Sequence, residues 1–440
     1  MQQRQYALYP DTLGKLERKQ EALDFYERTL QIKPGFAAAY NGKGNTFRSL
    51  KRDEEALIAY ECAIHLDSNN AIYHDNAGLA LCNLGRYQEA LTAHERALQL
   101  DSSNVIFHKN KGLALRKLKC SEEALVAFEQ ALQLAPQSAA VHINKADTLC
   151  ELERNEEALT DYKRAIELDP TSVAAYIGKG NALNEMQFNE EALEAYEYAI
   201  GRDPISIAAY IGKGHVLNEL HRNEEALAAF EYAVELNPAS LAAYTGKGDA
   251  LSELQRHEEA LVAYEEALKL DPDFVPAHNG IGNMLYKLKQ YQEALDAYQQ
   301  VLQLDPNDSI FHSNMGRVLY ALERNKEALA AYERAIQLNP KDALAHFNKG
   351  NALWRLDRNV GALHAYERAI QLAPNFAAAY DSKGNALRCL NRNNEALVAY
   401  ERAIQLNPND AAFHNNKGIA FLLTMVWGMY FSIKNVIRRP

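Results

Sequence analysis

Seven histidines recur along the sequence at separations of 34 residues or multiples of 34, and histidine is a common zinc ligand. They are His74, His108, His142, His278, His312, His346 and His414. Tyrosine occupies the same place in other copies of the repeat, so the alternation indicates a packing site of aromatic size. Neighbouring helices lie roughly 10 Å apart, which is too far for two imidazoles to share one zinc ion. We therefore expect structural histidines, with no metal and no cofactor.

No catalytic motif accompanies these histidines. The sequence contains no HExxH, no GxSxG and no P-loop, and no GxGxxG follows a strand. The Gly178-Lys179-Gly180 triplet and its copies lie inside helical patterns rather than in phosphate-binding loops. Nearly every residue is a copy of one 34 positions away, whereas an active site needs a unique constellation. The sequence therefore predicts a protein that is not an enzyme.

The composition limits which classes of partner and which cellular compartment we expect for the protein. The 440 residues carry a formal charge of -11, much of it in Glu pairs at helix starts, such as Glu156-Glu157 and Glu224-Glu225. An acidic chain without a basic arm argues against nucleic-acid binding. The N-terminal residues lack the apolar run of a signal peptide. An odd number of cysteines without a CxxC pair predicts reduced thiols in the cytoplasm; they are Cys62, Cys82, Cys120, Cys150 and Cys389.

The elements that position all these residues are clearest between Val173 and Ser206, which we number as repeat positions 1 to 34. Small or apolar residues at helical spacing predict a first helix: Ala175, Tyr176, Gly180, Leu183 and Met186. Asn189 offers an N-cap for a second helix, with Glu190 and Glu191 in its first turn. Pro204 ends that second helix because proline cannot continue the hydrogen-bond ladder.

The unit is therefore expected to be a helix hairpin. Gly180, Ala192 and Ala199 let the two helices approach closely, while Tyr176 and Tyr196 fill the wedge between them. One hairpin cannot bury its apolar faces alone, so it must stack on copies of itself.

The pattern resembles the tetratricopeptide repeat (TPR) family: an aromatic at position 4, Gly at 8, Ala at 20, an aromatic at 24, Ala at 27 and Pro at 32. Position 20 is Ala in every one of twelve units, and position 8 is Gly in eleven of thirteen. The resemblance implies an all-α, right-handed superhelical solenoid. The predicted units are 3–36, 37–70, 71–104, 105–138, 139–172, 173–206, 207–240, 241–274, 275–308, 309–342, 343–376 and 377–410, with a partial thirteenth unit and a divergent apolar helix at 411–440.

The two ends depart from the pattern. Pro10 stands at position 8 of the first unit and should break its first helix, which we expect only from Asp11 onward. At the other end, residues 411–421 predict a first helix, but residues 419–433 form an uncharged stretch with no trace of a second helix. Three interpretations of this stretch are open: a hydrophobic cap helix, a short or tilted membrane anchor, or the altered end of a longer array.

In TPR proteins, positions 2, 5, 6, 9, 12 and 13 of the first helices face a concave groove. The resemblance therefore implies a peptide-binding groove between residues 275 and 410, where these positions are aromatic and basic. Its predicted residues are Asn283, Tyr286, Lys287, Arg317, Tyr320, Phe347, Asn351, Trp354, Arg355, Asn385 and Arg388. A second-choice groove, small-floored and acidic at its edge, is predicted at Asn181, Asn184, His215, Asn218 and Asp249.

Two known binding modes of the family can be compared with these positions. The carboxylate clamp for chaperone C-termini is absent, because position 2 is Ala, Ile, Leu or Pro from Ala38 onward. The array resembles the long superhelix of O-linked N-acetylglucosamine transferases, in which a ladder of asparagines at position 6 grips peptide backbone. Here the ladder is interrupted: Asn76, Asn110, Asn144, Asn314, Asn348 and Asn416 match, whereas Gly42, Gly178, Gly212, Gly246, Gly280 and Ser382 do not.

We therefore predict a non-catalytic scaffold that binds a partner protein or an extended peptide in its groove. One alternative is the substrate-recruiting part of a larger kinase or glycosyltransferase. Another is a membrane-tethered assembly factor, which would contact the membrane only through residues 419–433.

Overall fold

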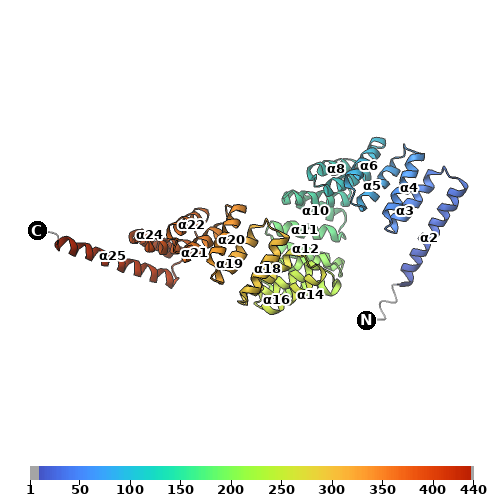
Figure 1. Cartoon of the computed structure of the whole chain (residues 1–440). Coiled ribbons are helices and arrows are strands. Elements are labelled where there is room, and N and C mark those ends of the chain that lie inside the picture. Colours follow the sequence, from blue (N-terminus) through green and yellow to red (C-terminus); the bar gives the residue numbers. More distant parts are fainter. Residues whose placement is uncertain (1–8, 438–440) are drawn as a thin grey trace. The chain divides into compact units, whose positions relative to one another are not determined.

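The computed structural model describes the backbone of residues 9–437 and the side chains of residues 18–426. Within these ranges the chain consists of α-helices joined by short turns, without a β-strand (Figure 1). It divides into two compact units, residues 1–221 and residues 222–440. The prediction of an all-α solenoid of stacked helix hairpins is confirmed in each unit, where every helix contacts its neighbours in sequence.

The first unit begins with one long helix, and the described helices after it alternate between 13 and 14 residues. They are α2 (Tyr9–Ile32), α3 (Ala37–Ser49), α4 (Asp53–Leu66), α5 (Ala71–Asn83), α6 (Tyr87–Leu100), α7 (Val105–Lys117), α8 (Ser121–Leu134), α9 (Ala139–Glu151), α10 (Asn155–Leu168), α11 (Val173–Glu185), α12 (Asn189–Arg202) and α13 (Ile207–Glu219).

The second unit continues the alternation and ends in a helix of 27 residues. Its helices are α14 (Asn223–Leu236), α15 (Leu241–Glu253), α16 (His257–Leu270), α17 (Val275–Lys287), α18 (Tyr291–Leu304), α19 (Ser309–Ala321), α20 (Asn325–Leu338), α21 (Ala343–Arg355), α22 (Asn359–Leu372), α23 (Ala377–Cys389), α24 (Asn393–Leu406) and α25 (Ala411–Ile437).

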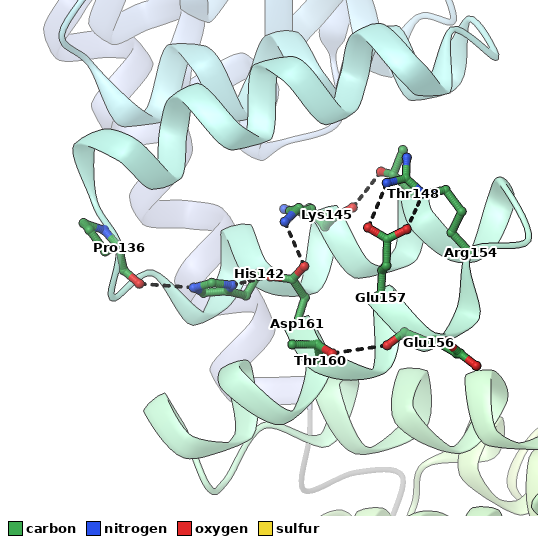
Figure 2. Close-up of polar contacts among 10 residues, drawn as sticks. Pro136, His142, Lys145, Thr148, Arg154, Glu156, Glu157, Thr160 and Asp161 are labelled. Atoms are coloured by element: carbon green, nitrogen blue, oxygen red, sulfur yellow. Dashed lines mark hydrogen bonds and ion pairs between the residues drawn. The ribbon is translucent and has the colours of Figure 1, made fainter.

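The turn inside each hairpin is built from positions 14 to 19. Between α9 and α10, Leu152 closes the first helix and Glu153 takes the left-handed conformation, with φ of 60°. Arg154 then precedes the second helix, and its Nε donates to Glu157 Oε1 over 2.7 Å (Figure 2). The Arg154 N–H also donates to the carbonyl of Leu149 over 2.9 Å. Left-handed backbone costs a non-glycine residue about 1–2 kcal/mol, and these bonds offset that cost.

The core of most hairpins is a glycine against a ring. In the hairpin of α11 and α12, a Cβ atom on Gly180 would lie 2.8 Å from the ring of Tyr196. Ala192 and Ala199, on the same face of α12, are completely buried. The predicted close approach at these three small residues is confirmed. Tyr176, in contrast, is only half-buried and stacks on Tyr198, with 5.5 Å between the ring centroids.

The expectation for the first unit is partly wrong. Residues 3–8 lie outside the described part of the chain, but α2 already begins at Tyr9 and includes Pro10 in its first turn. Proline is tolerated there because the first N–H groups of a helix have no partner inside it. No hairpin turn interrupts α2, although Glu17 and Arg18 have the sequence of the turn at Glu153 and Arg154.

The predicted N-cap of the second helices is also wrong. Phe188, not Asn189, precedes α12, and Asn189 is the first helical residue. The Asn189 side-chain oxygen accepts no hydrogen bond. The expected carboxylates do lie in the first turn, at Glu190 and Glu191. In most hairpins an Arg at position 16 pairs with a Glu at position 19, so charge pairing at the turn takes the place of an asparagine cap.

At its C-terminal end the chain forms α25, which packs on α24 and α23 through the buried Phe413 and Ala420. The helix runs through the uncharged stretch without a break, so no second helix folds back on it within the described residues. Across the described residues, no helix combines the length and the apolar character that a membrane crossing requires.

Candidate functional site

Most recurring polar side chains form hydrogen bonds or ion pairs within the repeats. The tyrosines at position 24 are the first group. Seven of them donate the hydroxyl to the residue at position 9 of their own hairpin, over 2.6 to 3.0 Å: Tyr60 to Asn45, Tyr162 to Asp147, Tyr196 to Asn181, Tyr264 to Asp249, Tyr298 to Asn283, Tyr366 to Asn351 and Tyr400 to Asn385. Burial is the main cause that raises the pKa of Tyr400 to about 12. These hydroxyls therefore serve as neutral structural donors.

The lysines at position 7 join successive hairpins. Lys213 Nζ lies 2.8 Å from Glu197 Oε1, where Glu197 is at position 25 of the preceding hairpin. Lys349 repeats the pair with Glu333 over 2.9 Å. In three Gly-Lys-Gly triplets the lysine, Lys43, Lys213 or Lys247, thus pairs with a glutamate of the preceding unit and stabilises the stack.

The seven histidines lock the turn between hairpins. Each Nε2 lies 2.8 to 3.2 Å from the carbonyl oxygen six residues earlier, as an N–H donor would. At His142, Nδ1 also lies 2.6 Å from Asp161, which pairs with Lys145 over 3.0 Å (Figure 2). Among the described side chains, no three His, Cys, Asp or Glu residues gather as a metal site would need. The alternation of these histidines with tyrosine indicates a packing site, but it gives no sign of the hydrogen bond from Nε2 to the carbonyl oxygen.

Four of the six asparagines at position 6 bond backward along the stack. Asn416 Nδ2 donates to both carboxylate oxygens of Asp381, over 2.9 and 3.1 Å, and Asn110 does the same to Asp75. Burial raises the pKa of Asp381. Where position 6 is glycine instead, the ring of the preceding hairpin fills the space, as Tyr162 does at Gly178. Two packing solutions therefore alternate along what the sequence presents as an interrupted ladder.

Three aromatic residues at position 12 stand apart from these contacts. Tyr286, Tyr320 and Trp354 lie on α17, α19 and α21, which are successive first helices in direct contact. All three are half-buried and pack on the edge of the core of the second unit. Each therefore has a fixed base and an exposed edge.

Arginines lie between these aromatic residues. The Arg317 guanidinium lies 4.7 Å from the ring centroid of Tyr286. Arg355 Nε donates to the Tyr320 hydroxyl over 3.2 Å, and this bond is the main cause that raises the pKa of Arg355. Arg388 follows at position 12 of α23, and the Nε atoms of Arg317 and Arg388 have no hydrogen-bond partner. We call this set the aromatic–arginine strip: Tyr286, Arg317, Tyr320, Trp354, Arg355 and Arg388.

The other residues of the predicted groove are more strongly tied to the scaffold. Phe347 packs between Tyr366 and Phe376, with ring centroids 5.8 and 4.8 Å away. Lys287 Nζ donates to Ser252 Oγ over 3.0 Å. Asn283, Asn351 and Asn385 each accept a tyrosine hydroxyl at Oδ1, and Asn385 Nδ2 also donates to Asp381 over 3.1 Å.

The second-choice groove falls on both compact units. In the first unit, Asn181 accepts from Tyr196, and Asn184 Nδ2 donates to Glu219 Oε1 over 3.4 Å. Asn218 is half-buried and His215 is exposed on the same helix, α13. In the second unit, Asp249 accepts the hydroxyl of Tyr264 over 2.6 Å. The structure therefore does not bring these five residues together in one compact unit.

Sequence reasoning missed one hollow, at the turn between α7 and α8. A cavity of about 630 Å³ is lined there by Arg116, Cys120, Glu151 and their neighbours. Arg116 pairs with Glu151 over 2.9 Å and with Asp147 over 3.2 Å. Two of the charges that line the cavity, Arg116 and Glu151, are thus paired with each other.

Family models described as "TPR repeat" and "Tetratricopeptide repeat" match most of the chain between residues 37 and 424. The first matches residues 78–119, 146–187, 248–289, 316–357 and 384–424. Related models match residues 37–70, 105–138, 177–240, 275–308 and 343–376. Every one of these models describes the TPR, and none describes a catalytic domain. A search of curated protein sequences found no match.

Several solved structures are similar. The APC/C hetero-tetramer Cut9-Hcn1 is 15% identical, with 94% of this chain and 95% of that chain covered and a TM-score of 0.50. Yeast Tom70 is 15% identical, covers 92% of this chain over its whole length, and has a TM-score of 0.45. YrrB, titled a TPR protein with an unusual peptide-binding site, is 28% identical over 44% of this chain and 99% of its own, with a TM-score of 0.38.

The hairpins, their glycine–ring cores and the family matches along the chain agree with one another. The chain belongs to the tetratricopeptide repeat family and is an all-α scaffold for protein–protein interaction.

Proposed function

We propose that the chain binds an extended peptide of a partner protein along the first helices α17, α19, α21 and α23, and that it catalyses no reaction itself. The aromatic–arginine strip is the proposed contact surface. The observation that carries the proposal is the row of Tyr286, Tyr320 and Trp354 at one repeat position of three successive units. Elsewhere that position holds smaller or polar residues, such as Asn184 and Ser252.

The chemistry of the strip suits a hot spot of binding. Tyr, Trp and Arg are the side chains enriched where interfaces gain most of their free energy. The base of Trp354 is packed on the core, so little conformational entropy is lost when its exposed edge is covered. Most of the other recurring polar side chains already have partners in the scaffold.

The ligand is expected to be acidic, aromatic, or both. Arg317, Arg355 and Arg388 place positive charge on one face of a chain whose formal charge is -11. Such local charge speeds the association of acidic ligands and selects against basic ones. For Asn283 and Asn351, the tyrosine hydroxyls occupy Oδ1, which leaves the amide Nδ2 groups to donate to a peptide backbone.

The proposal is tested by presenting the full chain with an array of synthetic 15-residue peptides graded in acidic and aromatic content. The affinity of the selected peptides is then measured by fluorescence anisotropy with wild type and with Trp354→Ala. Because truncation of a central Trp costs about 2 kcal/mol, binding should weaken roughly thirtyfold.

Asn184→Ala is the matched control, because it changes the same repeat position in the second-choice groove. It should leave peptide binding unchanged, and circular dichroism should show both variants folded. Unchanged affinity in Trp354→Ala together with lost affinity in Asn184→Ala would move the site to the second-choice groove.

We also propose a reducing, cytoplasmic compartment. All five cysteines are free thiols in the structure. Burial raises the pKa of the Cys82 and Cys150 thiols, which keeps them protonated and unreactive.

A further inference from the structure

The two terminal helices each lack the partner that a hairpin provides. α2 packs on α3, and α25 packs on α24, so each already uses the side that faces its neighbouring hairpin. In the described part of the chain, neither helix has the antiparallel partner of its own hairpin. Comparison with the same repeat positions in the other units shows which residues of each terminal helix are left exposed.

On α2 the uncovered positions are those of a second helix. Its residues 19–32 follow the second-helix pattern, with Ala22 at position 20 and Tyr26 at position 24. In every other unit the Ala at position 20 is fully buried, and the ring at position 24 is at most 2% exposed. Ala22 and Tyr26 are only partly buried, and Phe25 at position 23 is 65% exposed.

On α25 the uncovered positions are those of a first helix. In nine other units, a Cβ on the position-8 glycine would meet the position-24 ring at less than 3 Å, as Gly350 would meet Tyr366. Gly418 holds this position, and nothing lies within 4 Å of its Cβ direction. Position 11 is at most 9% exposed elsewhere, but Phe421 at this position is 54% exposed.

The two helices are therefore complementary halves of one repeat. No ring packs on Gly418 of α25. Tyr26 of α2 has no glycine at position 8 of its own unit, because Pro10 stands there. Position 23 meets position 4 within a hairpin, as the contact of Asp161 with His142 shows (Figure 2). The same register places Phe25 against His414.

The lengths of the helices also agree. With Tyr26 seated at Gly418, the antiparallel register runs α2 along nearly all of α25, because the two helices have 24 and 27 residues. At 1.5 Å per residue the shared length is about 36 Å.

We propose that α25 of one copy of this chain pairs with α2 of a second copy, completing a TPR hairpin between them. The partner is a second copy rather than the other end of the same chain. Each hairpin contacts only its neighbours, so the two ends of one chain would meet only if the stack closed on itself. Pairing between two copies needs no such closure. The contact is heterologous, since a head meets a tail, so copies join into open chains or rings rather than into a pair with one shared two-fold interface. This proposal is independent of the peptide site.

The test is the mass of the full chain by light scattering and sedimentation over a range of concentrations. Wild type should grow beyond a dimer as concentration rises. Phe25→Glu and Phe421→Glu each place a charge in the contact, so each should weaken association at least about tenfold. Gly418→Leu should do the same, because its side chain fills the slot for Tyr26, yet it should not unfold α25.

A mixture distinguishes this arrangement from others. The Phe25→Glu chain keeps an intact tail and the Phe421→Glu chain keeps an intact head. The two variants together should therefore form a one-to-one dimer and nothing larger. Val262→Glu on α16 is the matched control, since Val262 is 55% exposed and far in sequence from both ends; it should associate like wild type.

Three results would overturn the proposal. Wild type that stays a monomer at all concentrations would leave both faces without this partner. Association that survives Phe25→Glu but not Phe421→Glu would indicate a symmetric pair of α25 helices. A mixture of folded variants that forms no dimer would show that the two faces do not recognise each other.

Discussion

Helices α11 and α21 are equivalent first helices of two repeat units, and they carry different surface residues. In α11, Gly180 meets the ring of Tyr196, whose hydroxyl donates to Asn181 over 2.6 Å. In α21, the equivalent Gly350 meets the ring of Tyr366, whose hydroxyl donates to Asn351 over 2.9 Å. The contacts that hold each hairpin together are therefore the same in both regions.

The two helices differ at seven positions, among them positions 4, 6 and 12. There α11 carries Tyr176, Gly178 and Asn184, whereas α21 carries His346, Asn348 and Trp354. Because the hairpin core uses other positions, these residues can change without rebuilding the fold. In the proposed binding mode, position 12 contributes specificity and the glycine–ring core contributes stability, and the following substitutions test that separation.

The largest effect is expected at the shared core. Gly350→Ala would place a Cβ 2.5 Å from the buried ring of Tyr366, and Gly180→Ala would place one 2.8 Å from Tyr196. Overpacking of this kind costs about 1–3 kcal/mol, so both variants should lower the free energy of unfolding by similar amounts. Urea denaturation followed by circular dichroism measures the loss.

Gly201→Ala is the control, since nothing lies within 4 Å of a Cβ at this exposed helical glycine. It should raise the free energy of unfolding by about 0.5–1 kcal/mol, because alanine favours a helix over glycine. A large loss in one region and none in the other would mean that the two hairpin cores are not equivalent.

The second effect concerns charge on the strip. Arg355→Glu reverses a charge beside Tyr320, so an acidic peptide should bind about tenfold more weakly at low salt, where exposed charges are least screened. The difference from wild type should shrink as salt rises. The matched change in α11 alters no arginine, because Glu185 occupies that position, and Glu185→Gln should have no effect on the same peptide. A salt-independent difference would argue that Arg355 acts through packing alone.

Much of the scaffold could be predicted because its residues recur. The spacing of Gly180, Ala192 and Tyr196 predicted a close hairpin, since small residues and rings repeated at fixed positions admit few other arrangements. The left-handed turn at Glu153 could not be predicted, because position 15 accepts Lys, Glu, Gln, His, Asp and Asn alike and is fixed by backbone bonds.

The candidate site was less accessible to prediction. The departure of Trp354 and Arg355 from the repeat predicts a site there, and the structure adds how Arg355 contacts Tyr320. The same signal predicts Phe347 as a site residue, yet Phe347 packs against Phe376, a loop residue outside the helical periodicity. The continuous helix α2 depends on contacts that are missing at the end of a stack, and periodicity carries no information about missing neighbours.

A third effect isolates one hydrogen bond. Tyr366→Phe and Tyr196→Phe each remove the hydroxyl that bonds position 9, and the expected loss is about 0.5–1.5 kcal/mol in the free energy of unfolding. Phe128 and Phe230 occupy this position naturally, so the ring itself fits. Equal losses in the two regions would support one shared core. A loss in binding without a loss in stability for Tyr366→Phe would instead place Asn351 in direct contact with the peptide.

The smallest effect is a dependence on pH that the two regions should not share. Burial is the main cause that lowers the pKa of His346 below 6.5, and the nearby Arg368 and Lys349 act in the same direction. The folded chain therefore favours the neutral imidazole, whose Nε2–H donates to the carbonyl of Pro340. A histidine with a lowered folded pKa contributes its full stability above the unfolded pKa, and that contribution is lost as pH falls below it.

His346→Tyr, which installs the residue of α11, should reduce the loss of unfolding free energy between about pH 7.5 and about pH 5.5. The reciprocal Tyr176→His should add a loss over the same interval. Urea midpoints at the two pH values measure both changes, and a wild type that loses no more stability than His346→Tyr would show that this imidazole stays as easily protonated in the fold as in the unfolded chain.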